Sequence, residues 1–582
     1  MIALTMSGSF RFPPLTGDLQ RSSQLEMDAA VKTLSDHKNE WFTLPVRQKI
    51  AILDLLVKDL AAGAHRWVAA GLEAKGLAPD STAAWEEWAG GPYIAMVNLC
   101  RLRESLVDIA RSGKPRVPGP LTVRPDGQLV ARVFPRRGYD RLFLGGVTAE
   151  VWMQPGVTAQ SLPATQAVTF NGGTHAGRVA LVLGAGNGSS IGASDILYRL
   201  FVRNQVVIYK VNPVNSYMGP LFEESFRALV TGGYLRIVYG GAEEGTYLCS
   251  DSDVDEVHIT GSDKSFEAIV FGAGPNGAAR KAKNQPLMNK PVTAELGNVS
   301  PVIVVPGPWS ESDLAYQGEH IASMLVANAG FNCLTPRVLI QHMGWDRREE
   351  LLRRVRLILR ATPARKAYYP GARQRFEAFL SAHPDAETFG AASNGDLPWA
   401  LIPYLDPNEQ DDICFTTEAF CGLFSETALR ADGVADYISR AVAFANDHLW
   451  GTLNATLLVH PESLRDRAVA AAVDRAVADL RYGCVTVNQG AGSAYGLCVV
   501  PWGGFPAGAS LSDIQSGIGF VHNTLMFERA QKCVVRGPFR AKRTPPWFPT
   551  RSRRAAELFA KLVGFEASPS PWKVPGILRR AM

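Results

Sequence analysis

The sequence predicts an α/β protein of two or three domains whose main sheets are parallel. The chain has 582 residues, which is more than one hydrophobic core usually serves. From Arg178 onward, apolar segments of strand length alternate with segments of helical periodicity, the pattern of parallel α/β units. Hydrophobic residues make up 46% and charged residues 20% of the chain, as in an ordinary globular protein.

The first part of the chain is expected to be helical over residues 24–115. Val46–Leu60 and Ile94–Ile109 repeat apolar residues at spacings of three and four, which is typical of amphipathic helices. Residues 120–160 change to β-rich stretches, namely Gln128–Phe134 and Asp140–Val147. These stretches predict a hairpin or a small β arm.

The alternating part begins with a strand, a helix and a second strand, and continues with a further helix and strand. The expected segments are Val179–Gly184, Ala193–Val202, Gln205–Lys210, Leu221–Val230 and Tyr234–Tyr239. A second α/β series is expected between Val292 and Val500, with strands at Pro301–Val305, Arg337–Ile340, Ala455–Val459 and Cys484–Asn488. Ligands of parallel sheets bind at the carboxyl ends of the strands.

Two segments carry groups suited to covalent catalysis. Glu295 lies in Val292–Asn298 beside Gly297, and Cys333 ends the Gly/Asn-rich stretch Asn328–Cys333. A thiol nucleophile with a separate carboxylate base can form and resolve a covalent intermediate. Taken alone, Cys333 would more often be a small core residue, and Glu295 a surface carboxylate. Their order and spacing among other landmarks favour a site.

These landmarks follow one another along the chain, and together their order and spacing are specific. They are Gly186-Asn187, Lys210, Thr260-Gly261-Ser262, Glu295-Leu296-Gly297, Asn332-Cys333, Glu418-Ala419-Phe420 and Pro501-Trp502-Gly503-Gly504-Phe505. From about Arg178 to Phe527 the chain resembles the aldehyde dehydrogenase superfamily, as a divergent member. The resemblance implies NAD(P)-dependent oxidation of a small-molecule aldehyde to a carboxylic acid.

The resemblance also implies the catalytic roles. Cys333 would attack the aldehyde carbon to give a thiohemiacetal and then a thioester. The Asn187 side chain and the Cys333 backbone N–H would stabilise the oxyanion. Glu295 would act as general base, activating the water that hydrolyses the thioester.

The cofactor implied is NAD or NADP. Lys210 would reach the adenosine ribose, Ser262 would contact the pyrophosphate at a helix start, and Glu418 would hold the nicotinamide ribose beside Phe420. Three residues after the lysine stands Pro213, where many NAD-preferring relatives have a glutamate that would repel a 2′-phosphate. NADP is therefore at least as plausible as NAD. The cofactor-binding residues implied in full are Lys210, Thr260, Gly261, Ser262, Glu295, Leu296, Gly297, Glu418 and Phe420.

By the same resemblance the chain divides into a Rossmann-type nucleotide-binding domain, an α/β catalytic domain and a small β oligomerisation arm. A homodimer or homotetramer follows by analogy. The expected parts are a helical N-terminal part of the nucleotide-binding domain (1–119), the arm and linker (120–176), the nucleotide-binding core (177–290), the catalytic domain (291–500), a return to the arm (501–530) and a basic C-terminal extension (531–582).

Other classes of protein fit the sequence less well. No apolar run reaches the length of a membrane span, and Met1–Arg11 lacks the features of a secretory signal, so a cytoplasmic protein is expected. The eight cysteines form no CxxC pair, which argues against a disulfide framework or a metal site. The twelve Lys and Arg of residues 531–582 could contact nucleic acid or membrane, but a helix docked on its own protein is the preferred interpretation, with no nucleic acid partner.

Two alternatives remain at this point. One is a coenzyme A-dependent acyl reductase, whose relatives often lack the glutamate seen at Glu295. The other is a catalytically silent nucleotide-binding scaffold protein, suggested by Ala185 and Gly188 beside Asn187 and by Phe266, which puts bulk near the expected pyrophosphate path. The stretch Phe271–Pro286 reads as an insertion.

Overall fold

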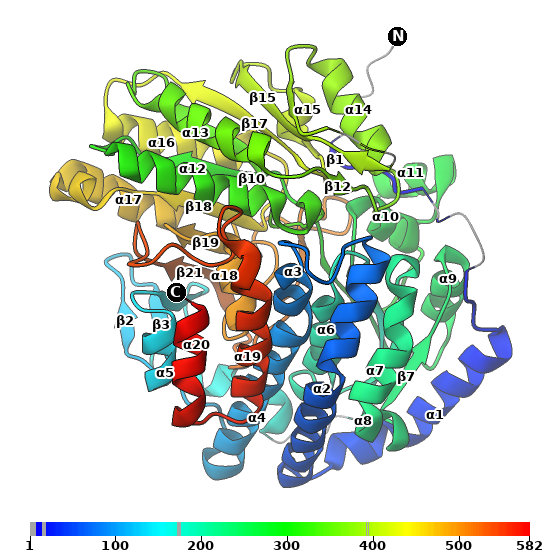
Figure 1. Ribbon diagram of the computed structural model, residues 1–582. Helices are drawn as coiled ribbons and strands as arrows, with labels where there is room; N and C mark the ends of the chain where they lie inside the picture. The colour runs from blue at the N-terminus through cyan, green and yellow to red at the C-terminus, as the bar shows by residue number, and fades with distance from the viewer. Residues whose placement is uncertain are drawn as a thin grey trace.

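The computed structural model describes residues 7–13, 15, 19–171, 176–391, 393 and 395–581. The expectation that no secretory signal begins the chain concerns residues 1–6 among others, and those six lie outside the described residues. Two large sheets organise the protein, one of six strands and one of eleven. Most neighbouring strands in both run parallel, and helices surround them (Figure 1). The predicted α/β fold is confirmed.

Helices form the first part of the chain, as expected. The first of them begins with a capping box, in which Ser23 and Glu26 satisfy each other's backbone N–H groups. A π-helical turn that contains Pro92 precedes the fourth helix, since proline removes a helical hydrogen bond. The helical segments are α1 (Gln24–Thr43), α2 (Val46–Ala74), α3 (Trp85–Trp88), η1 (Ala89–Tyr93) and α4 (Ile94–Ser112).

The six-stranded sheet has the order β20-β9-β8-β5-β6-β7. Its strands are β5 (Val179–Leu183), β6 (Val206–Lys210), β7 (Leu235–Val238), β8 (Glu256–Thr260), β9 (Val292–Glu295) and the antiparallel edge strand β20 (Gly517–Ile518). The chain runs from β5 to β6 and β7, then returns to β8 on the other side of β5. This reversal is a topological switch point, where ligands of open α/β sheets bind.

Helices connect these strands and flank the sheet. They are α6 (Ser189–Phe201), η4 (Pro213–Met218), α7 (Gly219–Ser225), α8 (Arg227–Thr231), α9 (Ala242–Ser250), α10 (Asp263–Phe271) and α11 (Gly274–Ala282). The expected insertion after Phe271 therefore forms α11, a second short helix before β9. The strands expected at residues 179–184, 205–210 and 234–239 are confirmed within one residue at each end.

The eleven-stranded sheet joins the expected catalytic domain and the expected arm in one continuous sheet, in the order β13-β15-β17-β11-β10-β18-β19-β21-β4-β3-β2. The catalytic strands are β10 (Ser300–Val304), β11 (Pro336–His342), β13 (Glu387–Phe389), β15 (Trp399–Leu405), β17 (Leu423–Leu429), β18 (Asn454–Leu458) and β19 (Cys484–Val487). The expected arm supplies β2 (Leu121–Val123), β3 (Leu129–Phe134) and β4 (Thr148–Met153), whereas β21 (Ala530–Arg536) comes almost entirely from the expected C-terminal extension. β21 pairs with β19 on one side and with β4 on the other, so the arm docks on its own chain.

Short elements and helices complete the catalytic part. The helices are α12 (Glu311–Val326), η5 (Ala327–Gly330), α13 (Arg348–Ala361), α14 (Ala372–Ala382), α15 (Ile413–Thr416), α16 (Val434–Asp447), η6 (Pro461–Arg465), α17 (Arg467–Asp479) and α18 (Ala491–Leu497). α12 packs on α13, and α16 on α17. Two short pairings lie outside the large sheets: β1 (Gly8–Ser9) with β16 (Thr417–Glu418), and β12 (Arg365–Lys366) with β14 (Asp396–Leu397).

One β-rich stretch was predicted wrongly. Residues 138–143 form the short helix α5 (Gly138–Phe143), not a strand. The Asp140 carboxylate accepts hydrogen bonds from the backbone N–H groups of Arg136 and Arg137. These bonds satisfy donors at the helix start, and they outweigh the β propensity of the apolar residues that follow.

The C-terminal extension contains the 3₁₀ turns η7 (Ser552–Arg554) and η8 (Pro571–Lys573) and the helices α19 (Ala555–Ala567) and α20 (Val574–Arg580). α19 lies against α2, α3 and α4 (Figure 1), with Phe559 and Val563 in the main core. The expected helix docked on its own protein is confirmed.

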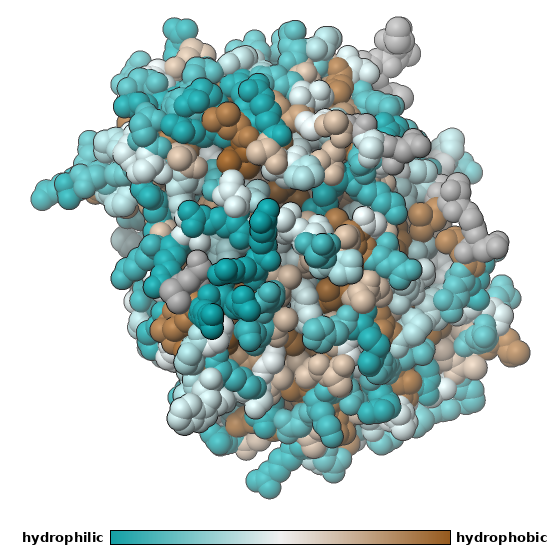
Figure 2. Space-filling model, viewed as in Figure 1, coloured by the Kyte–Doolittle hydropathy of each residue, from teal (hydrophilic) through white to brown (hydrophobic). Residues whose placement is uncertain are grey.

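The face in Figure 2 is mostly hydrophilic with scattered apolar residues. Within the described residues none of the helices combines the length and apolarity needed to cross a membrane.

Candidate active site

The carboxyl ends of β5, β8 and β9, the end of η5 and the segment around β16 meet at one small cavity. All but one of the residues expected in the site line it: Asn187, Thr260, Gly261, Ser262, Glu295, Leu296, Gly297, Cys333, Glu418 and Phe420. The exception is Lys210. These residues lie between Asn187 and Phe420 in the sequence, and the fold brings them to a single place.

The loop before Cys333 has an unusual backbone. Asn328, Ala329 and Gly330 have φ values of 52°, 54° and 76°, the left-handed region that L-residues other than glycine and asparagine rarely adopt. At Gly330 a Cβ would overlap the carbonyl group of Cys421, so glycine is required there. The three residues lie within η5 and precede Cys333, which lines the cavity.

A buried polar network holds this loop against the strand-to-helix turn that carries Asn187. The Asn328 side-chain amide donates to the Asn187 carbonyl oxygen at 2.8 Å, while its own oxygen accepts from the Lys75 ammonium at 2.8 Å and from the Tyr368 hydroxyl at 3.0 Å. Lys75 in turn is paired with Glu87 at 2.7 Å, both almost fully buried. The network therefore ties the N-terminal helices to both segments of the site.

The Asn187 side chain reaches the cavity from the glycine-rich turn between β5 and α6. Its amide nitrogen donates to the Phe331 carbonyl oxygen at 2.9 Å. An amide has two N–H donors, so one bond orients the group beside the Cys333 loop and the second N–H remains for a developing negative charge.

Glu295 and Cys333 are in direct contact. The Cys333 thiol donates to Glu295 Oε1 at 3.4 Å, and the Trp502 indole N–H donates to the same oxygen at 3.2 Å. Burial, with the negative charge of Asp195 next in effect, raises the pKa of Glu295 to about 8, while the two donors act in the opposite direction. Burial and the charge of Glu295 also raise the pKa of the Cys333 thiol well above its ordinary value.

A carboxyl group with a pKa near neutrality exchanges protons readily at working pH, which is what a general base requires. In the resting site the thiol and the carboxyl group share one close contact and are both mainly protonated. When Glu295 is ionised, transfer of the thiol proton to its carboxylate moves the negative charge onto the Cys333 sulfur inside a buried site, where neighbouring donors must stabilise it.

Glu418 lies at the other end of the cavity. Burial raises its pKa to about 7, against the lowering effect of the Arg337 guanidinium. One carboxylate oxygen accepts from the Asn298 backbone N–H at 3.3 Å, and a Cβ on Gly297 would overlap this carboxylate. The glycine of the Glu295-Leu296-Gly297 motif thus gives Glu418 room to reach the cavity.

Lys210 lies apart from the other site residues. Its ammonium donates to the Gly240 carbonyl oxygen at 2.7 Å, and burial lowers its pKa to about 8. Ser262 is the N-cap of α10, and its hydroxyl accepts from the Ser265 backbone N–H. The Phe266 side chain, which was expected to lie near the pyrophosphate, is fully buried in the core and does not line the cavity.

Four residues at or beside the cavity escaped the sequence reasoning: Phe12, Ile191 and Tyr369 line it, and Trp502 donates to Glu295 without lining it. Trp502 stands in the Pro501–Phe505 landmark, but nothing in that motif indicates that its indole would bind Glu295. Phe12 and Tyr369 come from segments without a recognisable motif. The expectation of no metal concerned the whole chain, and His383, Asp412 and Cys414, which lie close enough together to share an ion, stand outside this cavity.

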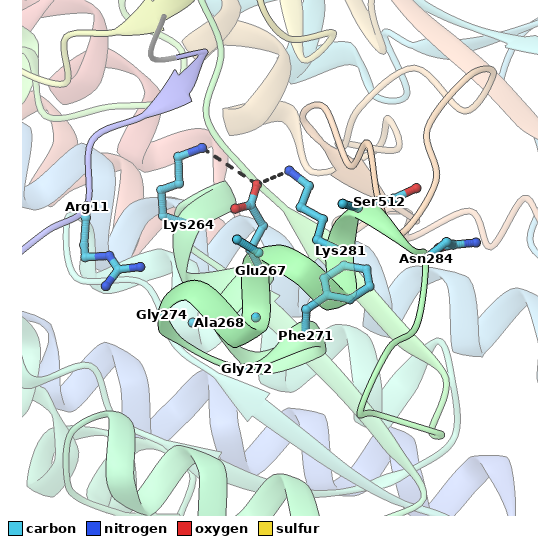
Figure 3. A pocket seen from close by; sticks show the side chains of 13 residues that line it. Arg11, Lys264, Glu267, Ala268, Phe271, Gly272, Gly274, Lys281, Asn284 and Ser512 are labelled. Carbon is cyan, nitrogen blue, oxygen red and sulfur yellow. Dashed lines mark hydrogen bonds and ion pairs between the residues drawn. The ribbon is translucent and has the colours of Figure 1, made fainter. Parts of the chain in front are cut away.

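A second, larger hollow of about 600 Å³ lies beside α10 and α11. Figure 3 shows Lys264 and Lys281 directed at Glu267, with Arg11 entering from the N-terminal segment. α11, which the sequence insertion adds, forms one wall. No site residue expected from the sequence lines this hollow.

Comparison with known proteins agrees with this geometry. The sequence model described as the aldehyde dehydrogenase family matches residues 190–365, a stretch that includes Thr260–Ser262, Glu295 and Cys333. Over this stretch, about a third of its length, the chain is similar to the aldehyde dehydrogenase family. Nothing among the curated proteins matches this divergent dehydrogenase-like sequence.

Solved aldehyde dehydrogenase structures have the same fold. An NAD-dependent aldehyde dehydrogenase from Sinorhizobium meliloti is 15% identical with a TM-score of 0.60, covering 88% of this chain and 87% of its own. NADP-dependent glyceraldehyde-3-phosphate dehydrogenase from Bacillus halodurans C-125, complexed with NADP, is 15% identical with a TM-score of 0.58 and coverages of 88% and 91%. A salicylaldehyde dehydrogenase from Pseudomonas putida G7 is 14% identical with a TM-score of 0.56 and coverages of 90% and 92%.

Proposed function

We propose that the chain oxidises a small-molecule aldehyde to a carboxylic acid, with NAD or NADP as the hydride acceptor. The observation that carries the proposal is the contact of the Cys333 thiol with Glu295 Oε1 at 3.4 Å, beside the Asn187 amide in one cavity. A nucleophile, its base and an oxyanion donor are the groups that this chemistry requires.

In this mechanism the ionised form of Glu295 takes the proton of the Cys333 thiol, and the thiolate attacks the aldehyde carbon. The free N–H of Asn187 donates to the oxygen that becomes negative in the thiohemiacetal. A bound nicotinamide dinucleotide would supply the oxidation by accepting the hydride from the same carbon. Glu295, after losing its proton, then activates a water that hydrolyses the Cys333 thioester and releases the acid.

The donor set of the cavity suits a dinucleotide: Ser262 caps a helix start, where anions are stabilised, and the Glu418 carboxylate can accept from ribose hydroxyls. Solved structures of the same fold include complexes with NADP, and Pro213 in place of a carboxylate leaves room for a 2′-phosphate. Both NAD and NADP therefore belong in the first assay.

The test is NAD(P)H formation from a panel of aliphatic and aromatic aldehydes, with Cys333→Ser as the blank. Turnover should be lost in Cys333→Ser and strongly slowed in Glu295→Gln, because the same carboxylate is proposed to ionise the thiol and to activate the water that hydrolyses the thioester. Cys249→Ser is the matched control, because Cys249 is also partly buried but lies outside the cavity. Unchanged turnover in both site variants would exclude the mechanism.

Two other functions make different predictions for the same assay. A coenzyme A-dependent acyl reductase would form product only when coenzyme A is added; the close contact of Glu295 with the thiol favours water as the acceptor instead. A silent scaffold protein would show no dependence on Cys333 at all.

A further inference from the structure

The N-terminal segment 7–13 crosses the cavity in which the dinucleotide is proposed to bind. Its strand β1 pairs in parallel with β16, placing Ser9 opposite Glu418. The cavity is lined by Phe12 on one side and by Ser262, Glu418 and Phe420 among others. Residues 8–12 therefore lie against residues assigned to the cofactor.

Contacts with α10 fix the first residues of this segment. The Ser9 backbone N–H donates to Asp263 Oδ1 at 2.9 Å, and the Lys264 ammonium donates to the Ser7 carbonyl oxygen at 3.1 Å. A Cβ on Gly8 would overlap the Asp263 carboxylate, so the backbone at Gly8 packs directly against the start of α10. Asp263 and Lys264 directly follow Ser262, where the pyrophosphate is expected.

Aromatic packing holds the next residues against the catalytic domain. The Phe12 ring lies 5.2 Å from the Tyr369 ring and 5.6 Å from the Phe420 ring, measured between centroids. The Arg375 guanidinium covers the Phe12 ring at 4.7 Å. The segment thus bridges the nucleotide-binding and catalytic sheets across the cleft between them.

Neighbouring side chains of the segment point to opposite sides. Phe12 faces the catalytic cavity, whereas Arg11 faces the basic hollow beside α10 (Figure 3). Consecutive side chains of an extended backbone point to opposite sides in this way. The segment therefore has a side-chain contact on each side: Phe12 in the cavity and Arg11 in the larger hollow.

The space left beneath the segment is too small for the proposed cofactor. The cavity holds about 30 Å³, whereas pockets for small ligands enclose about 300 to 1,000 Å³. The donor set fits a dinucleotide but the volume does not. We propose that residues 7–13 form an autoinhibitory strap that a nicotinamide dinucleotide must displace before Cys333 can react.

This inference rests on the proposed function for the identity of the competing ligand, but the closure itself can be measured without it. The strap is loosened in two ways: Phe12→Ala removes the aromatic packing, and Gly8→Ala introduces a Cβ that clashes with Asp263. Phe143→Ala is the matched control, because it also removes a partly buried phenylalanine, on α5 and packed against Phe565.

The first measurement is the rate at which a bulky maleimide labels Cys333, followed by peptide mass spectrometry without dinucleotide. A closed strap limits labelling to the open population, so both strap variants should raise the rate at least about threefold and Phe143→Ala should not. The second is dinucleotide affinity by calorimetry. The apparent Kd equals the intrinsic Kd divided by the open fraction, so it should fall by at least about threefold in the variants.

Unchanged Cys333 labelling in both strap variants would overturn the strap. Faster labelling together with tighter dinucleotide binding would establish it. Faster labelling without binding of NAD or NADP to either variant would establish the closure but refute the dinucleotide as its competitor, and with it the proposed function. If the wild type binds the dinucleotide and neither strap variant changes the Kd, the strap does not compete with the dinucleotide, and the strap proposal is refuted while the proposed function stands.

Discussion

Replacing Trp502 by phenylalanine tests how the site controls the charge of Glu295. The substitution removes one N–H donor, at 3.2 Å from Glu295 Oε1, from a fully buried position. A hydrogen bond to a charged group contributes about 1.5 to 3 kcal/mol, and 1.36 kcal/mol corresponds to one pKa unit. The pKa of Glu295, about 8 in the intact protein, should therefore rise by about one to two units.

The consequence is measurable as a displaced pH profile. At pH 8 the ionised fraction of Glu295 should fall from about half to about a tenth or less. An activated ester such as p-nitrophenyl acetate acylates a reactive thiol in a burst and then turns over as the thioester is hydrolysed. The pH midpoint of the hydrolysis phase should move upward by one to two units in Trp502→Phe.

The chain offers a matched control for the loss of volume. Trp309 is also buried, and its indole N–H has no hydrogen-bond partner among the described residues. Trp309→Phe should lower stability to a similar degree through the smaller ring, yet leave the pH midpoint where it was. An unmoved midpoint in Trp502→Phe, or an equal displacement in the control, would refute the assigned role of the indole.

Three further predictions follow from the site. Gly330→Ala should abolish turnover and lower stability more than Gly127→Ala, since both have positive φ values but only Gly330 would place a Cβ against a backbone carbonyl; equal losses by urea denaturation would contradict this. Lys75→Met leaves Glu87 buried without its partner and should cost about 3 to 5 kcal/mol in the free energy of unfolding. The pKa of Glu295 is raised to about 8 in the folded protein, so the folded state holds a proton that the unfolded state releases, and the stability that Glu295 contributes falls as the pH rises from about 4.5 to 8. The free energy of unfolding of Glu295→Gln, compared with that of the wild type, should therefore be higher at pH 8 than at pH 5. Parallel curves of stability against pH would contradict this.

Much of the architecture could be predicted because it depends on local patterns. The alternation of apolar strands and amphipathic helices predicts the parallel sheets, and the turn after β5 predicts where Asn187 emerges. The residues that surround the cavity follow from strand ends, since parallel strands bring their carboxyl ends to one edge. Lys210 is the exception: it also ends a strand, but its ammonium is engaged by a backbone carbonyl.

The parts that could not be predicted depend on contacts between distant segments. The two-residue strand β1 has no periodicity of its own, and it forms because it pairs with β16, about 400 residues later in the chain. The hydrogen bond from Trp502 to Glu295 likewise joins residues from separate motifs. At Asp140, two local hydrogen bonds from backbone N–H groups to the carboxylate stabilise a helix where the apolar pattern indicates a strand.

The position of β21 has a consequence for the synthesis of the protein. This strand lies between β19 and β4, so the large sheet stays in two separate pieces until residues 530–536 have left the ribosome. Throughout that time β4 and β19 each expose an open edge, the kind of surface that pairs with other chains. A transcript cut short before codon 530 would therefore yield a protein that contains every residue of the proposed catalytic site and yet is prone to aggregate.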